Sequence, residues 1–236
     1  MKPHLKVSWC IAKVDSAFIA KMEEVLEVYA RPYDATYPVA CFDERPCFLI
    51  SDTIAPIPTQ QGKIAKEHYS YEKKGSCCLL AAIELLQGKR IAAVYEQRTK
   101  KEYTQFMQTL AEHYPKAKKI HVVQDNLNTH HISSFYEYLP ADEAKALADK
   151  FEFHYTPKSA SWLNMIEIEF SALSKQCLNR RIATKEMLEA QIKAIIKERN
   201  DKSIKINWQF SITKARTTLN KSYTAVNPTN IKFKQT

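Results

Sequence analysis

The amino-acid sequence predicts a mixed α/β domain in which one sheet is flanked by helices on both faces. Three observations support this fold class. Short apolar runs typical of buried strands alternate with longer segments whose apolar residues recur at helical spacing. Two of the strand-like runs are joined by Gln87-Gly88-Lys89, which indicates a hairpin. A hairpin followed by alternating helices and strands is the pattern of a mixed sheet covered on both sides.

The first half of the chain is expected to supply a helix, three strands and a second helix. Periodic apolar residues behind the cap candidates Asp15 and Ser16 predict the first helix. The second helix follows Thr99, which can form a capping box with Glu102. The expected elements, in order, are a helix over 15–29, a strand over 39–42 that ends at Asp43, an irregular polar excursion over 52–74, strands over 76–86 and 90–95, and a helix over 99–114.

The second half of the chain is expected to add two strands and several helices. The strand over 120–124 again ends at an acid, Asp125, and a third candidate inner strand is closed by Pro157. The expected elements, in order, are a strand over 120–124, a helix over 131–150, a strand over 151–155, helices over 161–178 and 184–199, and a short helix over 213–223.

Composition and charge narrow the class of protein. With 236 residues, of which 45% are hydrophobic, the chain can bury one substantial core, or one core with a small appendage. It lacks a long apolar run and a secretory signal, so we expect a cytoplasmic protein without a membrane span. Its six cysteines show no CxxC spacing, which favours buried free thiols over zinc ligands or disulfides. A net charge of +9 suits a polyanionic partner, although a solvated basic surface is an equally simple explanation.

Two aspartates occupy positions typical of ligand-binding groups in such sheets. Asp43 and Asp125 each follow a predicted buried strand, and ligands of α/β sheets bind beyond the carboxyl ends of the strands. If the two strands are neighbours, the repulsion between the carboxylates must be offset by a shared proton or a bound cation. Oxygen ligands favour Mg2+ or Mn2+. The simpler alternative is that both acids merely begin loops.

A third carboxylate from a helix packed on the sheet would complete a two-metal site. The predicted helix over 161–178 offers both Glu167 and Glu169, on opposite flanks of its apolar stripe. Glu167 shares a polar face with Asn164 and Ser171, which mildly favours a site on that side. Helical periodicity alone leaves the choice between the two glutamates open.

Four segments of the chain resemble the bacterial insertion-sequence transposases related to the mariner group, which are DDE superfamily endonucleases. The resemblance spans about 39–219 and rests mainly on the second-aspartate and third-acid motifs of that family. The matching segments are HVVQDNLNTHH (121–131), SASWLNMIEIEFSALSK (159–175), ACFDERP (40–46) and YSYEKKGSCCLLAAIEL (69–85). The pairing of the first two motifs is specific, whereas either one alone would be weak.

The resemblance implies an RNase H-like catalytic core that binds two Mg2+ (or Mn2+) ions and performs DNA strand cleavage followed by strand transfer. Matched residue by residue, the three catalytic and metal-binding acids are Asp43, Asp125 and Glu167, so the family motif selects Glu167 over Glu169. It also implies double-stranded DNA as the partner and a homodimer acting on that DNA in the bacterial cytoplasm, near the nucleoid. Met165 departs from the family, which usually has proline there.

The start of the chain is the larger departure. Family members normally carry a helix-turn-helix DNA-binding region ahead of the core, and here only about 38 residues precede the first predicted strand. We therefore expect a helix and lead-in over 1–38, the core over 39–200 and a basic extension over 201–236. A separate helix-turn-helix polypeptide is a candidate partner.

Six further residues are candidates for orienting the site or positioning DNA, and each has a structural alternative. His130 can contact a phosphate or simply be a loop residue. Asn126 and Asn164 can support the acids or cap a helix, and Trp162 can stack on a base or pack in the core. Arg180 and Arg181 can contact phosphates or be solvated surface residues.

Two other functions fit parts of the pattern. The chain can be a catalytically inactive or partner-dependent DNA-binding relative of a transposase, although its intact acids argue against this. It can also be an RNase H-like nuclease that acts on RNA, although the WLNMIE segment (162–167) argues against that.

Overall fold

The computed structural model describes residues 13–233 and contains one five-stranded sheet in the order β3-β2-β1-β4-β5. Strand β1 pairs antiparallel with β2 and parallel with β4, so the sheet is mixed as predicted. Pairs β2–β3 and β4–β5 are antiparallel and parallel respectively. The strands are β1 (Val39–Asp52), β2 (Tyr71–Glu84), β3 (Lys89–Tyr95), β4 (Ile120–Gln124) and β5 (Phe151–Tyr155).

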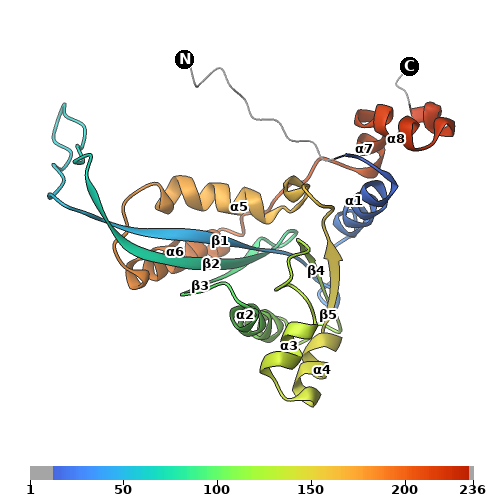
Figure 1. Cartoon of the computed structure of the whole chain (residues 1–236), viewed down its shortest axis with the longest axis horizontal. Helices are drawn as coiled ribbons and strands as arrows, with labels where there is room; N and C mark the ends of the chain where they lie inside the picture. The colour runs from blue at the N-terminus through green and yellow to red at the C-terminus, as the bar shows by residue number, and fades with distance from the viewer. Residues whose placement is uncertain (1–12, 234–236) are drawn as a thin grey trace.

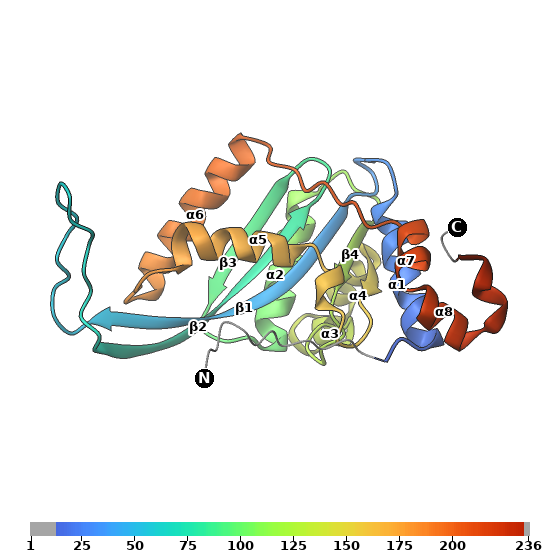
Figure 2. The same ribbon diagram turned by 90° about the horizontal axis from the view of Figure 1, so that it is seen from above.

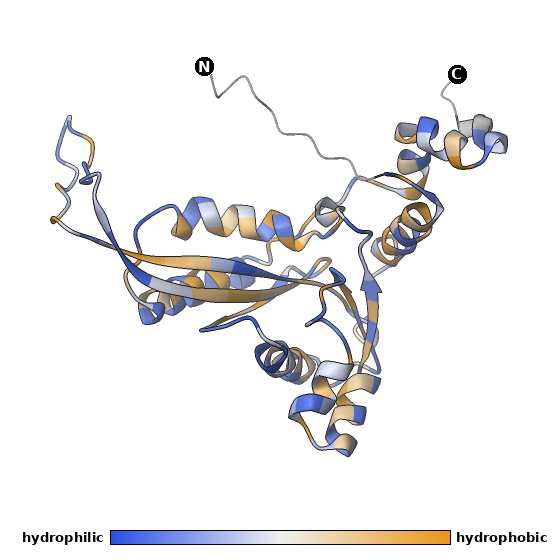
Figure 3. Cartoon of the chain, viewed as in Figure 1, coloured by the Kyte–Doolittle hydropathy of each residue, from blue (hydrophilic) through white to orange (hydrophobic). Residues whose placement is uncertain are grey.

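Helices cover both faces of this sheet, which confirms the predicted fold class (Figures 1 and 2). One apolar cluster joins one face of the sheet to α1, α5 and α6, and a second joins the other face to α2, α3 and α4. Figure 3 shows the apolar residues concentrated along the central strands. The helices are α1 (Ser16–Tyr29), α2 (Lys100–His113), α3 (Ser133–Tyr138), α4 (Ala141–Asp149), α5 (Ile166–Leu173), α6 (Lys185–Asp201), α7 (Ile212–Thr218) and α8 (Asn220–Val226).

Strand β1 is longer than predicted, because it continues through Asp43 instead of ending there. Its parallel pairing with β4 reaches only Cys41, but its antiparallel pairing with β2 continues to Asp52 opposite Tyr71. The predicted excursion over 52–74 therefore shrinks to the tip of a long β1–β2 arm, which projects from the sheet at the left of Figure 1. Asp43 thus lies where β1 loses its neighbour β4.

Two predicted helices are interrupted. Pro140 separates α3 from α4, because proline removes a backbone donor and disfavours a helical residue before it. The predicted helix over 161–178 starts as a 3-10 turn at Ser161–Leu163, continues as α5 and ends as a π-helical turn at Ser174–Leu178.

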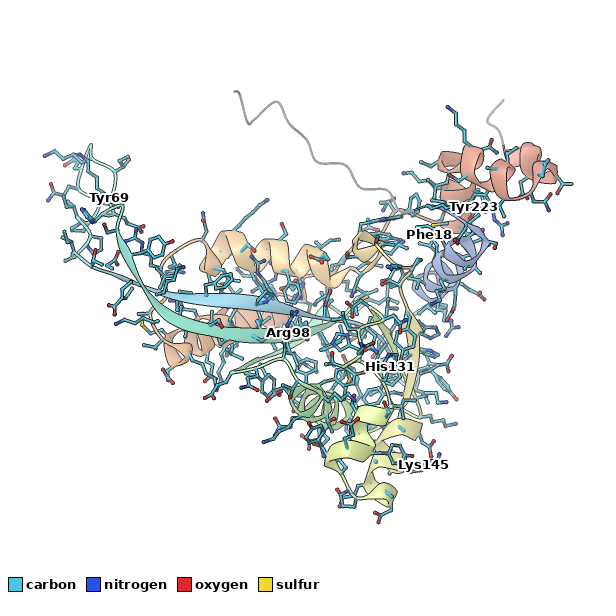
Figure 4. All side chains as sticks on the ribbon, viewed as in Figure 1. Phe18, Tyr69, Arg98, His131, Lys145 and Tyr223 are labelled. Atoms are coloured by element: carbon cyan, nitrogen blue, oxygen red, sulfur yellow. The ribbon has the colours of Figure 1, made fainter. Side chains whose placement is uncertain are left out.

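The basic C-terminal extension packs against the N-terminal helix. Phe18 and Met22 of α1 contact Ala215 and Tyr223 in a third apolar cluster, and Figure 4 labels Phe18 and Tyr223 at this junction. Glu23 of α1 accepts two hydrogen bonds from the Arg216 guanidinium, at 2.7 and 2.6 Å. Residues 1–12 of the predicted lead-in and 234–236 of the extension lie outside the described residues.

The structure also bears on the expectations about membrane spans and cysteines. In the described part of the chain, no helix combines the length and the apolarity that a membrane crossing requires. The cysteines of that part are free and buried, as predicted; they are Cys41, Cys47, Cys77, Cys78 and Cys177.

Candidate active site

Two neighbouring parallel strands bring Asp43 and Asp125 to the same edge of the sheet. Cys41 of β1 pairs with Val123 of β4, and each aspartate follows two residues later, Asp43 within β1 and Asp125 directly after β4. Parallel strands in register place such residues side by side. The backbone N–H of Glu44 donates to Asp43 Oδ1 at 2.8 Å.

Glu167 comes to the same edge of the sheet from α5, since Asn164, three residues before it, bonds the residue that precedes Asp43. The pKa of Asp43 is raised from 3.8 to about 7, chiefly by burial, and further by the charges of Asp125 and Glu167. The Glu44 amide and the His130 charge act in the opposite direction and only partly offset these effects. Three carboxylates from β1, the end of β4 and α5 therefore act on one another at the edge of the sheet.

Glu169 is held by two arginines on the other flank of α5. Its side chain is buried and lies 2.8 Å from Arg90 Nε of β3. It also accepts hydrogen bonds from Arg199 Nε at 2.8 Å and from Nη2 at 3.0 Å, both from α6. Glu167 is exposed at the first turn of α5, so the structure separates the two glutamates that helical periodicity leaves tied.

Asn164 fixes the start of α5 to the strand that carries Asp43. Its buried side chain donates from Nδ2 to the backbone oxygen of Phe42 at 2.8 Å. We expected Asn164 to support a carboxylate directly or to cap a helix. The first contact is with the backbone next to Asp43, and Asn164 Oδ1 also accepts from the Ile166 N–H at 3.4 Å, at the start of α5. Asn164 thereby links the helix that carries Glu167 to the strand that carries Asp43.

His130 is a buried partner of Asp125. Its Nδ1–H donates to Asp125 Oδ1 at 2.6 Å, and its Nε2 lies 3.4 Å from Glu44 Oε2. Burial alone would lower the pKa of His130, but the hydrogen bond to Asp125 and the contact with Glu44 outweigh it and raise the pKa to about 9. The ring stacks on Tyr103 with centroids 5.0 Å apart. A charged imidazole thus fixes the orientation of the Asp125 carboxylate.

Glu44 and Arg98 belong to the same network and were missed by the sequence interpretation. Arg98 Nη1 donates to Glu44 Oε1 at 3.1 Å, and Glu44 is the second carboxylate facing His130. Figure 4 labels Arg98 near the middle of the sheet. The only signal available in the sequence was the position of Glu44 next to Asp43. Alternation along a strand suggested that it points away, and nothing local indicates that His130 reaches it.

The family of the chain follows from its sequence match. A model of the DDE superfamily endonucleases matches residues 38–189, which is more than half of the chain. The chain belongs to this family. A comparison with curated proteins found no match.

Solved structures support the fold of this DDE endonuclease. The chain is similar to the Mos1 mariner paired end complex with Mn at a TM-score of 0.56 and 13% identity, covering 95% of this chain and 66% of that chain. It is also similar to the catalytic domain of Mos1 mariner transposase at a TM-score of 0.52 and 11% identity, covering 97% of this chain and 100% of that chain. The chain therefore spans about two thirds of the Mos1 chain in the paired end complex. These likenesses confirm the RNase H-like fold.

Asn126 and Trp162 have different surroundings. Asn126 lines a cavity of about 370 Å³ together with Asp125, Lys21 and Lys158. Trp162 is 48% exposed and meets Phe210 edge to face with centroids 5.5 Å apart. Both residues are accessible to a ligand, so their assignment to DNA positioning stays a prediction.

Arg180 and Arg181 both make hydrogen bonds within the described chain, and their assignment to phosphate contacts stays a prediction. Arg180 Nε donates to the backbone oxygen of Cys177 at 3.0 Å, where the π-helical turn ends. Arg181 donates to Asp52 Oδ1 at 2.7 Å and to the His68 backbone oxygen at 2.6 Å. Arg180 thus satisfies a carbonyl at the end of the helix, and Arg181 contacts the β1–β2 arm.

The three acids of the DDE endonuclease suit a divalent cation. A buried carboxylate among two others carries uncompensated negative charge, which is the condition that a hard cation relieves. In the described part of the chain, the oxygens of these three carboxylates do not all lie within 4.8 Å of one another. Carboxylates repel one another without a cation, so a looser arrangement is expected in its absence.

The pKa values of Asp43 and His130 predict how the metal-free protein responds to pH. Folding raises the pKa of Asp43 from 3.8 to about 7 and the pKa of His130 from 6.5 to about 9. Each group therefore contributes stability at low pH, and this contribution is lost as the pH rises between the two values of that group. We expect thermal melts in a chelator to show falling stability between pH 5 and pH 9.

The Asp43→Asn substitution is expected to make the stability of the metal-free protein less dependent on pH and to stabilise that protein at pH 8. The raised pKa sets an upper limit of about 4 kcal/mol on this gain. Glu137→Gln, at an exposed position on α3, is a matched control that should melt like the unaltered chain. An unchanged pH profile in Asp43→Asn would show that Asp43 titrates normally.

Proposed function

We propose that this chain is the catalytic core of a DNA transposase, in which Asp43, Asp125 and Glu167 hold two Mg2+ or Mn2+ ions. One observation carries the proposal: parallel pairing of β1 with β4 brings Asp43 and Asp125 to one edge of the sheet, and Asn164 fastens the start of the helix that carries Glu167 to the residue before Asp43. The raised pKa of Asp43 agrees with this arrangement. When bound, the cations would polarise the phosphoryl oxygens and stabilise charge during in-line displacement. The expected reactions are DNA strand cleavage and strand transfer.

The residues around the acids support orientation and proton control. His130 donates to Asp125 and fixes the direction of that carboxylate. Asn164 ties the helix that carries Glu167 to the strand that carries Asp43. A site of this kind must hold its ligands rigidly, since small displacements cost much of the benefit of positioning.

Double-stranded DNA is the proposed substrate and partner. The net charge of +9 favours a polyanion, and Lys21 and Lys158 line the cavity next to Asp125. Known Mos1 structures are a paired end complex, a pre-cleavage transpososome and a strand transfer complex. We propose by analogy that this chain acts as a homodimer on DNA, in the bacterial cytoplasm at the nucleoid. A separate helix-turn-helix polypeptide would help it to find the DNA ends of the transposable element.

The test compares substrates with the purified chain in Mg2+. A supercoiled plasmid carrying the DNA that flanks the coding region should be nicked, and a DNA oligonucleotide with a free 3′-hydroxyl should become joined to it. Asp43→Asn should do neither. Cleavage of an RNA–DNA hybrid without plasmid nicking would instead identify a nuclease that acts on RNA. Tight DNA binding with no metal-dependent reaction would identify a catalytically inactive relative.

A further inference from the structure

A second group of potential ligands lies at the opposite end of β4 from Asp125. His121 of β4 pairs with Glu152 of β5, and His154 follows Glu152 by two residues on the same strand. Residues two apart on a strand share a face, and directly paired residues lie side by side. The alternating residues of both strands, such as Val122 and Phe151, enter the apolar cluster on the other face. The three ligand groups therefore share the face that α1 covers.

The distances within this group are close to those between the ligands of a tetrahedral metal ion. His121 Nδ1 lies 3.0 Å from His154 Nε2, and Glu152 Oε1 lies 3.7 Å from each of these nitrogens. Tetrahedral zinc with bonds of about 2.0–2.1 Å requires donor atoms roughly 3.3 Å apart. Within residues 13–233, this is the one group of three histidine, cysteine or acidic residues whose donor atoms all lie within 4.8 Å of one another.

Glu24 of α1 supplies the outer contact that metal-binding histidines usually have. His154 Nδ1 lies 2.9 Å from Glu24 Oε1, so the proton of this ring is held at Nδ1 and the lone pair of Nε2 faces His121 and Glu152. A carboxylate that accepts a hydrogen bond from the second ring nitrogen fixes the tautomer of the histidine and raises its basicity as a ligand. Glu24 comes from a different element, so the group links α1, β4 and β5.

Arg31 lies close to His121, so a metal ion can bind only if this arginine leaves the Nδ1 lone pair of His121 open. Its Nη1 lies 3.3 Å from His121 Nδ1 and 3.2 Å from Nε2. An atom nearly equidistant from both ring nitrogens at this range lies over the ring face, so the in-plane lone pair of Nδ1 stays accessible. The metal-free alternative is a chain of hydrogen bonds from Glu24 through His154 to His121. This series of hydrogen bonds does not involve Glu152, whose Oε1 lies 3.7 Å from the facing nitrogens of both histidines.

We propose that His121, His154 and Glu152 bind a zinc-class transition metal at a structural site separate from the three carboxylates. Two imidazoles and one carboxylate favour Zn2+ over Mg2+, which prefers oxygen ligands. Glu152 is half-exposed and gives the ion a path from solvent. His121 precedes Asp125 by four residues on β4, which at roughly 3.3 Å per residue is about 13 Å away. The ion would fasten β4, which leads to Asp125, to β5, and Glu24 would tie α1 to the same site.

Cobalt absorbance tests this site without relying on DNA cleavage. Co2+ added to the full chain should give the visible bands of a tetrahedral ion at one equivalent, and one equivalent of Zn2+ should remove them. The bands should persist in Asp125→Asn, and should disappear in His154→Asn and Glu152→Gln. Glu24→Gln should weaken binding by about 10- to 100-fold. His113→Ala, at an exposed histidine on α2 whose ring contacts the Thr109 carbonyl, is the matched control.

A second readout keeps the test decisive if the buried histidine variant folds poorly. Glu152 is on the surface side of the group, so Glu152→Gln should melt like the unaltered chain in a chelator. Zn2+ should raise the melting temperature of the unaltered chain and of His113→Ala, but not that of Glu152→Gln. Absence of tetrahedral bands in the folded chain, or bands unaffected by Glu152→Gln and His154→Asn, would overturn the proposal in favour of a hydrogen-bonded histidine pair.

Discussion

Replacing Glu167 with glutamine is expected to reduce Mg2+-dependent DNA cleavage by roughly 100- to 1000-fold while leaving the fold intact. The side chain is exposed at the start of α5, and its charge acts on Asp43. Glutamine keeps the shape but removes the charge that would hold a cation. Losing several kcal/mol of charge stabilisation corresponds to this range, since each 1.36 kcal/mol is about tenfold in rate.

Steady-state cleavage of a labelled DNA duplex measures this effect, and urea unfolding of the same preparation measures stability. Glu189→Gln on α6 is a suitable control, because that glutamate lies on a different helix from the acids and is partly exposed. Cleavage by Glu167→Gln at the rate of the unaltered chain would remove Glu167 from the site and reopen the choice of the third acid.

Replacing Glu169 with alanine is expected to destabilise the protein by about 3–5 kcal/mol, the usual cost of removing one partner of a buried ion pair. Its carboxylate contacts Arg90, whose side chain is fully buried, and Arg199, which is almost so. Alanine would leave two guanidinium groups desolvated with no counter-charge, where α5, β3 and α6 meet. The loss should show in urea unfolding.

A double-mutant cycle separates the ion pair from simple loss of volume. Arg90→Met combined with Glu169→Met should cost less than the sum of the two single changes, because Arg90 is then not left as an unpaired buried charge and only Arg199 loses its partner. A loss below about 1 kcal/mol in Glu169→Ala, or strict additivity in the cycle, would contradict a structural role for Glu169. Either result would also weaken the separation of Glu169 from Glu167.

The strand pattern located Asp43 and Asp125, but it could not pair their strands. Each aspartate follows an apolar run, which is local information. Their proximity depends on parallel pairing of β1 with β4 across about eighty residues of chain, and a single sequence carries no measure of such pairing. The same limit hid the His121–His154 pair, since its two strands become neighbours only in the folded sheet.

Periodicity failed for Glu167 and Glu169 for a different reason. It reports how far each residue lies from the apolar stripe, and both glutamates flank that stripe. What separates them is Arg90 and Arg199, which come from β3 and α6. The family motif selected Glu167 without that information. Likewise, nothing local in the sequence shows that Arg181 reaches Asp52 and the His68 carbonyl, and its assignment to a DNA contact stays a prediction.

The central claim is that Asp43, Asp125 and Glu167 together bind the cations needed for DNA cleavage. Calorimetric titration of Mn2+ into the unaltered chain and into Asp125→Asn tests it most directly. The two proteins share every other ligand, including His121 and His154, so the difference between them isolates the three acids. We predict a binding component in the unaltered chain that disappears in a folded Asp125→Asn protein. Superimposable isotherms would contradict the account.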